Sequence, residues 1–271
     1  MLKCAPTMTT LTTGLWKIYA VRYAKHMRTT RENFMGGDPH DVSPMPMDYF
    51  VWAVIGEERT FVVDTGFDAM MAKKRGREYL HTPAEGLKTI GVDASKVEDV
   101  IITHMHYDHC GNHAMFPLAR YHVQDREMQY CTGRAMTHPF ARFPFEEEDV
   151  VAMIRRLYAS RIVFHDGDEE LAPGLSVHHV GGHTMGMQVV RVNTRRGFVV
   201  LASDSSHYYA NIERDLPYPL AHNLTEVLEG YRKVYSLASS RDHVIPGHDP
   251  LVLERYPAPR PELQGWVVRL D

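Results

Sequence analysis

The residues best suited to chemistry lie in the motif THMHYDH, residues 103–109, which places three histidines and an aspartate within six positions. Imidazole and carboxylate groups are common metal ligands. In an extended chain, side chains two positions apart project to the same side, so His104 and His106 can bind one ion together. Asp108 and His109 follow on an expected turn and can reach a second ion. The motif therefore predicts a metal site.

Further ligands are expected where other strands end. Three candidates each follow an apolar stretch, and they are His183, Asp204 and His248. A glycine precedes each of the two histidines and lets the backbone turn sharply near a metal. With Asp204 bridging, the five histidines and two aspartates give each of two ions four protein ligands. This set without thiolate suits zinc, although manganese, cobalt or iron would also fit.

Short apolar runs and amphipathic stretches must position these residues. We expect strands at residues 16–23, 49–55, 60–63, 99–102, 175–180, 188–192, 198–202 and 243–245. We expect helices from Pro83 onward, at 146–160 and at 225–238. The long segment 26–47 is predicted to be irregular and is therefore a candidate functional loop. Strands alternating with helices and hairpins favour an α/β fold in which helices cover sheets.

A faint internal repeat supports convergence of the strand ends. Asp64 and Asp204 follow similar apolar runs, and His104 and His248 follow the next apolar run in each half. This pattern indicates two similar β-rich halves whose strand ends meet at one site.

Composition excludes several classes of protein. The chain has 271 residues, is 44% hydrophobic and carries a net charge of −4, so we expect one domain over residues 1–271. No basic cluster could follow a phosphate backbone, so nucleic acid is not an expected partner. No apolar stretch reaches the length of a membrane span, and the start of the chain lacks a signal peptide, which predicts a cytoplasmic protein without a membrane partner. Both a monomer and a homodimer remain open.

Cysteine usage does not suggest disulfides. The three cysteines are Cys4, Cys110 and Cys131, an odd and small number for a chain of this length. Cys110 adjoins the histidine motif, but we interpret it as a small buried residue that opens the next helix rather than as a ligand.

The combined motifs resemble the metallo-β-lactamase superfamily over roughly residues 49–249. The resemblance implies an αββα sandwich with a dinuclear site at one edge. It assigns one ion to His104, His106 and His183, the other to Asp108, His109 and His248, and the bridge to Asp204. It also implies that Asp64, in the sequence Asp-Thr-Gly, orients the site from behind the ligands.

Within that superfamily the chain most resembles the N-acyl homoserine lactonase branch. The resemblance implies that a metal-bridging hydroxide opens a small lactone, while Asp108 takes the proton and passes it to the leaving oxygen. One position departs from the pattern, because the lactonases place a tyrosine three residues after the bridging aspartate and this chain has His207, followed by Tyr208. Either side chain could donate a hydrogen bond to a developing oxyanion, or His207 could be a bystander.

Other functions remain as alternatives. A glyoxalase II-like thioesterase would share the seven ligands, but the stretch after His248 is too short for the helical domain that such enzymes add. A nuclease, a flavodiiron-type oxygen reductase and a purely structural metal protein fit less well. A small lactone or ester is the expected partner. An apolar acyl pocket is one interpretation of Met45, Met47, Met136, Phe140, Phe143 and Phe145, and anchoring of loops to the core is the other.

Overall fold

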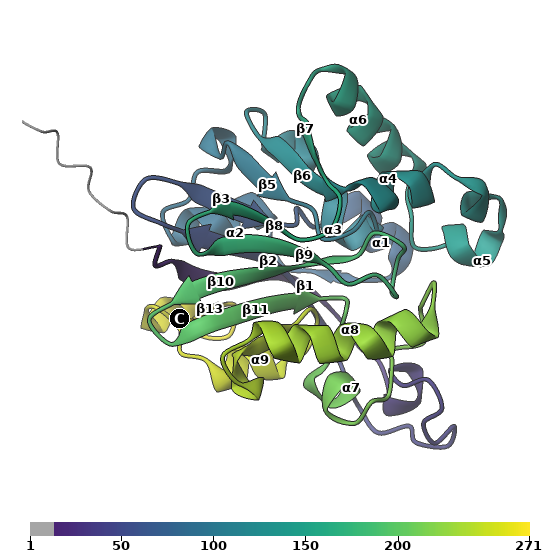
Figure 1. Cartoon of the computed structure of the whole chain (residues 1–271). Helices are drawn as coiled ribbons and strands as arrows, with labels where there is room; N and C mark the ends of the chain where they lie inside the picture. Colours follow the sequence, from purple (N-terminus) through teal and green to yellow (C-terminus); the bar gives the residue numbers. More distant parts are fainter. Residues whose placement is uncertain (1–13) are drawn as a thin grey trace, which may run out of the picture.

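The computed structural model describes residues 14–271, and its centre is a pair of β-sheets packed face to face (Figure 1). The start of the chain, which is predicted to lack a signal peptide, and Cys4 lie outside these residues. The first sheet contains β1 (Lys17–His26), β2 (Met47–Ile55), β3 (Thr60–Val63), β4 (Glu78–Tyr79), β5 (Asp99–Ile101), β6 (Arg120–Gln124), β7 (Ile162–His165) and β13 (Val267–Arg269). The second contains β8 (Glu169–Ala172), β9 (Leu175–His179), β10 (Gln188–Thr194), β11 (Gly197–Ser203) and β12 (Val244–Pro246).

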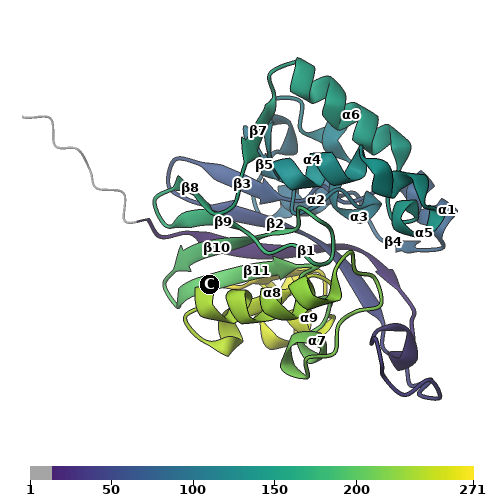
Figure 2. The same ribbon diagram turned by 45° about the vertical axis from the view of Figure 1, so that its right-hand side comes forward.

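Helices cover the outer face of each sheet, as Figures 1 and 2 show. Those on the side of the first sheet are α1 (Ala69–Arg75), α2 (Pro83–Thr89), α3 (Tyr107–Cys110), α4 (Asp125–Cys131), α5 (Pro139–Arg142) and α6 (Glu147–Tyr158). Those on the side of the second sheet are α7 (Tyr209–Glu213), α8 (Leu224–Leu237) and α9 (Leu251–Arg255). Among the described residues, no helix is both long and apolar enough to cross a membrane.

The period of two along a strand explains why the sheets stack in this way. In β2, Phe50, Trp52 and Val54 belong to the core between the two sheets, whereas Tyr49 and Val51 belong to the core under the helices. Both faces of the strand are apolar and buried, so each must be covered by another layer. The αββα architecture implied by the resemblance to the metallo-β-lactamase superfamily is thereby confirmed.

Several boundaries differ from the expected ones. Strand β1 continues to His26 because a register shift between Arg22 and Ala24 keeps it paired with β2. Strands β4, β6, β7, β8 and β13 were not predicted, since they are short and lack a clear apolar alternation. Segment 26–47 is irregular as expected, apart from the end of β1, a 3₁₀ turn at Thr30–Glu32 and the first residue of β2.

The internal repeat corresponds to two parallel strand pairs. Strand β3 pairs in parallel with β5 in the first sheet, and β11 pairs in parallel with β12 in the second. Parallel strands end at the same edge of a sheet, so the residues that follow each pair are brought together. The candidate ligands lie at this edge.

Candidate metal centre

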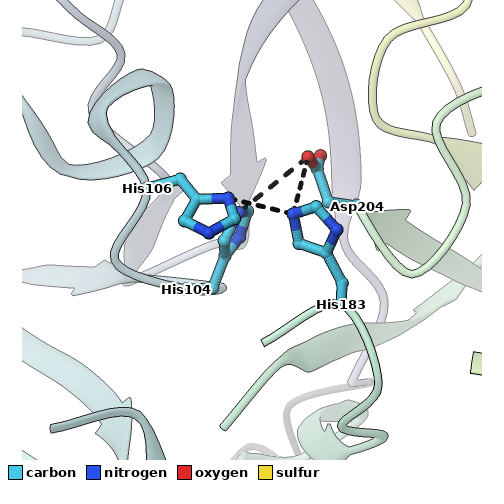
Figure 3. Close-up of side chains that lie close together, drawn as sticks. All are labelled: His104, His106, His183 and Asp204. Atoms are coloured by element: carbon cyan, nitrogen blue, oxygen red, sulfur yellow. Dashed lines mark hydrogen bonds and ion pairs between the residues drawn. The ribbon is translucent and has the colours of Figure 1, made fainter. Parts of the chain in front are cut away.

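The seven candidate ligand side chains come together at the strand ends, and all are buried. One group consists of His104, His106, His183 and Asp204, and Figure 3 shows the three imidazole rings turned toward one another and toward the carboxylate. The second group consists of Asp108, His109 and His248. Within each group the potential ligand atoms lie within 4.8 Å of one another, so each group could hold one ion.

The Asp204 carboxylate lies between the two groups. Its Oδ2 atom lies 3.4 Å from Nε2 of His183 and 3.9 Å from Nε2 of His104. Its Oδ1 atom lies 2.9 Å from Nε2 of His248 and 3.3 Å from Nε2 of His109. Each oxygen therefore faces a different group, which is the arrangement required of a bridging carboxylate.

Backbone carbonyls fix the tautomers of two rings. Nδ1 of His183 lies 2.9 Å from the carbonyl oxygen of Leu220, and Nδ1 of His248 lies 2.8 Å from that of Asp48. A carbonyl only accepts, so Nδ1 must carry the proton in both rings. The Nε2 lone pairs then point into the site, as in ligating histidines whose other nitrogen is held by an acceptor.

The Asp64 carboxylate fixes the tautomer of the His109 ring. Asp64 is fully buried, adopts a left-handed backbone conformation with φ of 60°, and accepts hydrogen bonds from the amide and hydroxyl of Thr103. Its Oδ2 atom also lies 2.7 Å from Nδ1 of His109. Burial raises the pKa of Asp64, and the contacts with His109 and Thr103 oppose that rise. The Thr103 hydroxyl in turn lies 3.1 Å from Nδ1 of His104, so one carboxylate lies behind rings of both groups.

The chemistry of this donor set fits divalent cations. Among residues 14–271, Nε2 of His104, Nε2 of His109 and Oδ1 of Asp204 are buried without a hydrogen-bond partner. Nδ1 of His106 faces Nε2 of His183 at 3.0 Å. Burial lowers the pKa of His183 to about 3, so that ring is neutral at physiological pH and its lone pair is available. Buried polar atoms are costly when unpaired, and a cation would satisfy them.

His207 and Tyr208, the two candidates for contact with a developing oxyanion, lie in different surroundings. His207 is buried beside the ligands, with its Nε2 atom 3.0 Å from Oδ2 of Asp204. Tyr208 is fully buried in the core under the helices, the same core that contains Tyr49 and Val51. Its hydroxyl has no hydrogen-bond partner within the described part of the chain. His207 therefore contacts a candidate ligand, whereas the Tyr208 hydroxyl forms no hydrogen bond to any of them among residues 14–271.

A cavity of about 290 Å³ opens onto the first group. Its lining includes His106 and His183 together with Phe140, Leu220 and His222. The sequence did not single out His222 as a candidate site residue. Nothing in the local sequence around it indicates a ligand pocket.

The six Met and Phe residues of the irregular segments divide between the two interpretations. Met45 and Met47 pack against the core. Phe140 lines the 290 Å³ cavity, and a larger cavity of about 870 Å³ is lined by Met136, Phe143 and Phe145 among others. Phe145 also contacts the ring of His106 edge-on, with centroids 4.7 Å apart.

Two findings differ from the sequence interpretation near the motif. Cys110 is buried and outside both ligand groups, but it closes α3 instead of opening a helix, and its thiol donates to the carbonyls of Met105 and His106.

Glu127, on α4, is fully buried and bonds to residues beside His104, His106 and His183, a role that was missed. No motif surrounds Glu127, and the mostly polar stretch that precedes it, residues 120–126, gives no signal of this role.

A family model and several known proteins are similar to this chain. Residues 46–251 match the family model of the metallo-beta-lactamase superfamily. An N-acyl homoserine lactonase from a Bacillus species is 27% identical over 190 residues, which cover 64% of this chain and 70% of that protein.

Solved structures share the fold. A quorum-quenching N-acyl homoserine lactone lactonase superposes with a TM-score of 0.72 at 20% identity, covering 88% of this chain and 94% of the other. AidC, a dizinc quorum-quenching lactonase solved with a product, superposes with a TM-score of 0.65 at 16% identity, covering 86% and 87%.

Proposed function

The chain belongs to the metallo-beta-lactamase superfamily, and from this premise we propose that it is a metal-dependent hydrolase that opens N-acyl homoserine lactones or related small lactones. The observation that carries the proposal is the position of Asp204, which turns one oxygen toward each of two groups of buried histidines. A structural zinc site is closed and binds one ion, whereas this arrangement suits a pair of ions at a catalytic site.

We assign the ligands as the geometry groups them. The first ion would be held by His104, His106 and His183, the second by Asp108, His109 and His248, and both by Asp204. The imidazole and carboxylate donors suit zinc. When bound, two such ions would supply an activated water and polarise the carbonyl of the substrate.

Asp108 would move the proton. Its Oδ2 atom lies 3.7 Å from Nε2 of His109 and 3.8 Å from Nε2 of His248, and the side chain retains slight exposure at the edge of the site. A carboxylate there can take the proton released by the attacking water and deliver it to the ring oxygen as the acyl–oxygen bond breaks. The ring then opens to a hydroxy acid.

His207 would orient the bridging carboxylate. It occupies the position of a tyrosine in the lactonase branch that the sequence resembles, but its Nε2 atom is within hydrogen-bond distance of Asp204. Burial lowers the pKa of His207 although Asp204 opposes that change, so the ring is neutral and has one N–H to donate. This contact supports a role for His207 in holding Asp204. It argues against the alternative in which His207 or Tyr208 contacts the substrate directly.

The 290 Å³ cavity provides a place for the acyl arm. Ala135, Phe140 and Leu220 offer apolar surface, while Tyr130 and His222 offer polar groups close to the first ligand group. Ligand sites are mostly apolar with a few polar anchors, which suits an acyl chain joined to the lactone by an amide.

A hydrolysis screen tests the proposal. We expect lactones of varied ring and acyl size to be opened, as followed with a pH indicator, and S-lactoylglutathione to be a poor substrate. Metal content is measured on the same sample and should approach two ions per chain. Turnover of the thioester alone would instead support the glyoxalase II-like alternative.

A further inference from the structure

Glu127 joins the two loops that carry the histidines of the first ligand group. Its Oε1 atom accepts a hydrogen bond of 2.7 Å from the amide of Met105, which lies between His104 and His106. Its Oε2 atom accepts from the hydroxyl of Thr184 at 2.6 Å and from the amide of Gly186 at 3.0 Å. Thr184 directly follows His183. One carboxylate therefore fixes the spacing between the two loops.

Packing leaves this connection little freedom. A Cβ atom at Gly186 would lie 2.1 Å from the amide nitrogen of Glu127, so the His183 loop passes directly against the start of α4. Glu127 itself is fully buried. Neither loop can shift relative to α4 without losing a hydrogen bond to a group that water does not reach.

The charge of Glu127 is also unusual. In the described structure, Asp64, Asp108, Glu127 and Asp204 are buried carboxylates around one site, and none of them forms an ion pair with a lysine or arginine. Buried charges normally have a partner of opposite sign. Negative charge around the site would compensate divalent cations, and Glu127 would add to it from outside the ligand groups.

We propose that Glu127 is a positioning residue for the first ion only, holding His104, His106 and His183 at their mutual spacing and supplying one negative charge. The inference rests on the proposed metal site. It does not extend to the second ion, because Glu127 makes no hydrogen bond to the residues that adjoin Asp108, His109 or His248 within residues 14–271.

The test measures metal affinity in single-ion backgrounds. His248→Ala removes a ligand of the second ion and should leave the first site able to bind its ion. His183→Ala removes a ligand of the first ion and should leave the second site able to bind its ion. Glu127→Gln is added to each background. Each protein is equilibrated with buffered free Zn²⁺ and the bound metal is measured by mass spectrometry. Cobalt(II) absorption spectra of the same proteins report the coordination of the remaining ion.

Glutamine has nearly the shape of glutamate but turns an NH₂ group toward at least one donor and removes the charge. We expect Glu127→Gln to weaken zinc binding roughly 10- to 100-fold in the His248→Ala background, the usual cost of losing support behind a ligand. Binding in the His183→Ala background should not change. Thr184→Val, which removes one donor and keeps the charge, should give a smaller loss in the same background only.

A matched control separates positioning from loosening of the fold. Asp149→Asn also replaces a buried carboxyl group by an amide, on α6, and should alter neither affinity. Equal loss in both backgrounds, or loss in neither, would overturn the inference for Glu127. If the wild-type protein binds two ions but hydrolyses no lactone, the proposed function fails while the affinity comparison still decides the role of Glu127.

Discussion

The imidazole ring of His207 lies parallel to the phenol ring of Tyr218, with centroids 3.7 Å apart and an interplanar angle of 9°. The guanidinium of Arg28 lies 5.3 Å from the centroid of the same phenol ring. Since Nε2 of His207 contacts Asp204, Tyr218 sets the plane of a ring that contacts the candidate bridging carboxylate. Arg28, His207 and Tyr218 thus meet behind one candidate metal ligand.

Removing the stacked ring of Tyr218 should lower kcat more than it changes KM or metal content. We expect Tyr218→Leu to lower kcat roughly 2- to 10-fold, since an aromatic pair contributes about 0.5–1.5 kcal/mol beyond its buried area. KM and metal content should stay near the wild-type values because no ligand is lost. Steady-state kinetics and metal analysis check this. Tyr218→Phe keeps the ring and should retain activity; equal damage in both variants would show that the hydroxyl, and not the stack, matters.

Loss of one first-site ligand should remove activity. We expect His106→Ala to abolish lactone hydrolysis and to lower the metal content, because its Nδ1 atom lies among the donors of the first group. Mass spectrometry of the bound metal and the indicator assay measure both effects. His178→Ala, on β9, is the control and should change neither. Full activity of His106→Ala would contradict the whole ligand assignment.

The clustering of the candidate ligands could be predicted from the sequence because each follows a strand that is apolar enough to identify. The supporting contacts could not. His183 and His248 are oriented by the carbonyls of Leu220 and Asp48, and a backbone carbonyl carries no signature of residue type. Glu127 was missed for a related reason, since its partners become neighbours only after the sheets have packed.

Metal removal should lower the stability of the fold. The buried nitrogens of His104 and His109 and Oδ1 of Asp204 have no hydrogen-bond partner in the described chain, and bound cations would satisfy them. A ligand at 100 times its Kd stabilises a folded protein by about 2.7 kcal/mol. We therefore expect chelation to lower Tm by roughly 5–10 °C. Calorimetry at several zinc concentrations checks this, and a Tm independent of zinc would argue against bound ions.

The cavity beside the first ligand group should limit the acyl chain. Ala221 lines this cavity, so Ala221→Phe would fill part of its 290 Å³. We expect KM to rise severalfold for lactones with long acyl chains and to change little for an unsubstituted lactone. Ala159→Phe, at the exposed end of α6, is the matched control and should leave both unchanged. An equal effect on all lactones would place the acyl arm elsewhere.

Stability should also depend on the ionisation of Asp149. This residue lies in the first turn of α6 and is only 9% exposed. Burial raises the pKa of Asp149 to about 7, and the nearby Glu146 and Asp68 add to the rise. An unfolded aspartate titrates near 3.9. Because the folded pKa is the higher one, the stabilising contribution is complete below about pH 4 and is lost as pH rises through 7.

Asp149→Asn removes this titration. The difference in unfolding free energy between variant and wild type should therefore shift in favour of the variant between pH 4 and pH 8. The shift is bounded by about 4 kcal/mol for three pKa units, and structural relaxation should reduce it to about 1–2 kcal/mol. Urea denaturation at the two pH values measures it. Glu148→Gln, at an exposed neighbouring position, should show no such shift. A difference that is the same at both pH values would mean that Asp149 titrates normally in the folded protein.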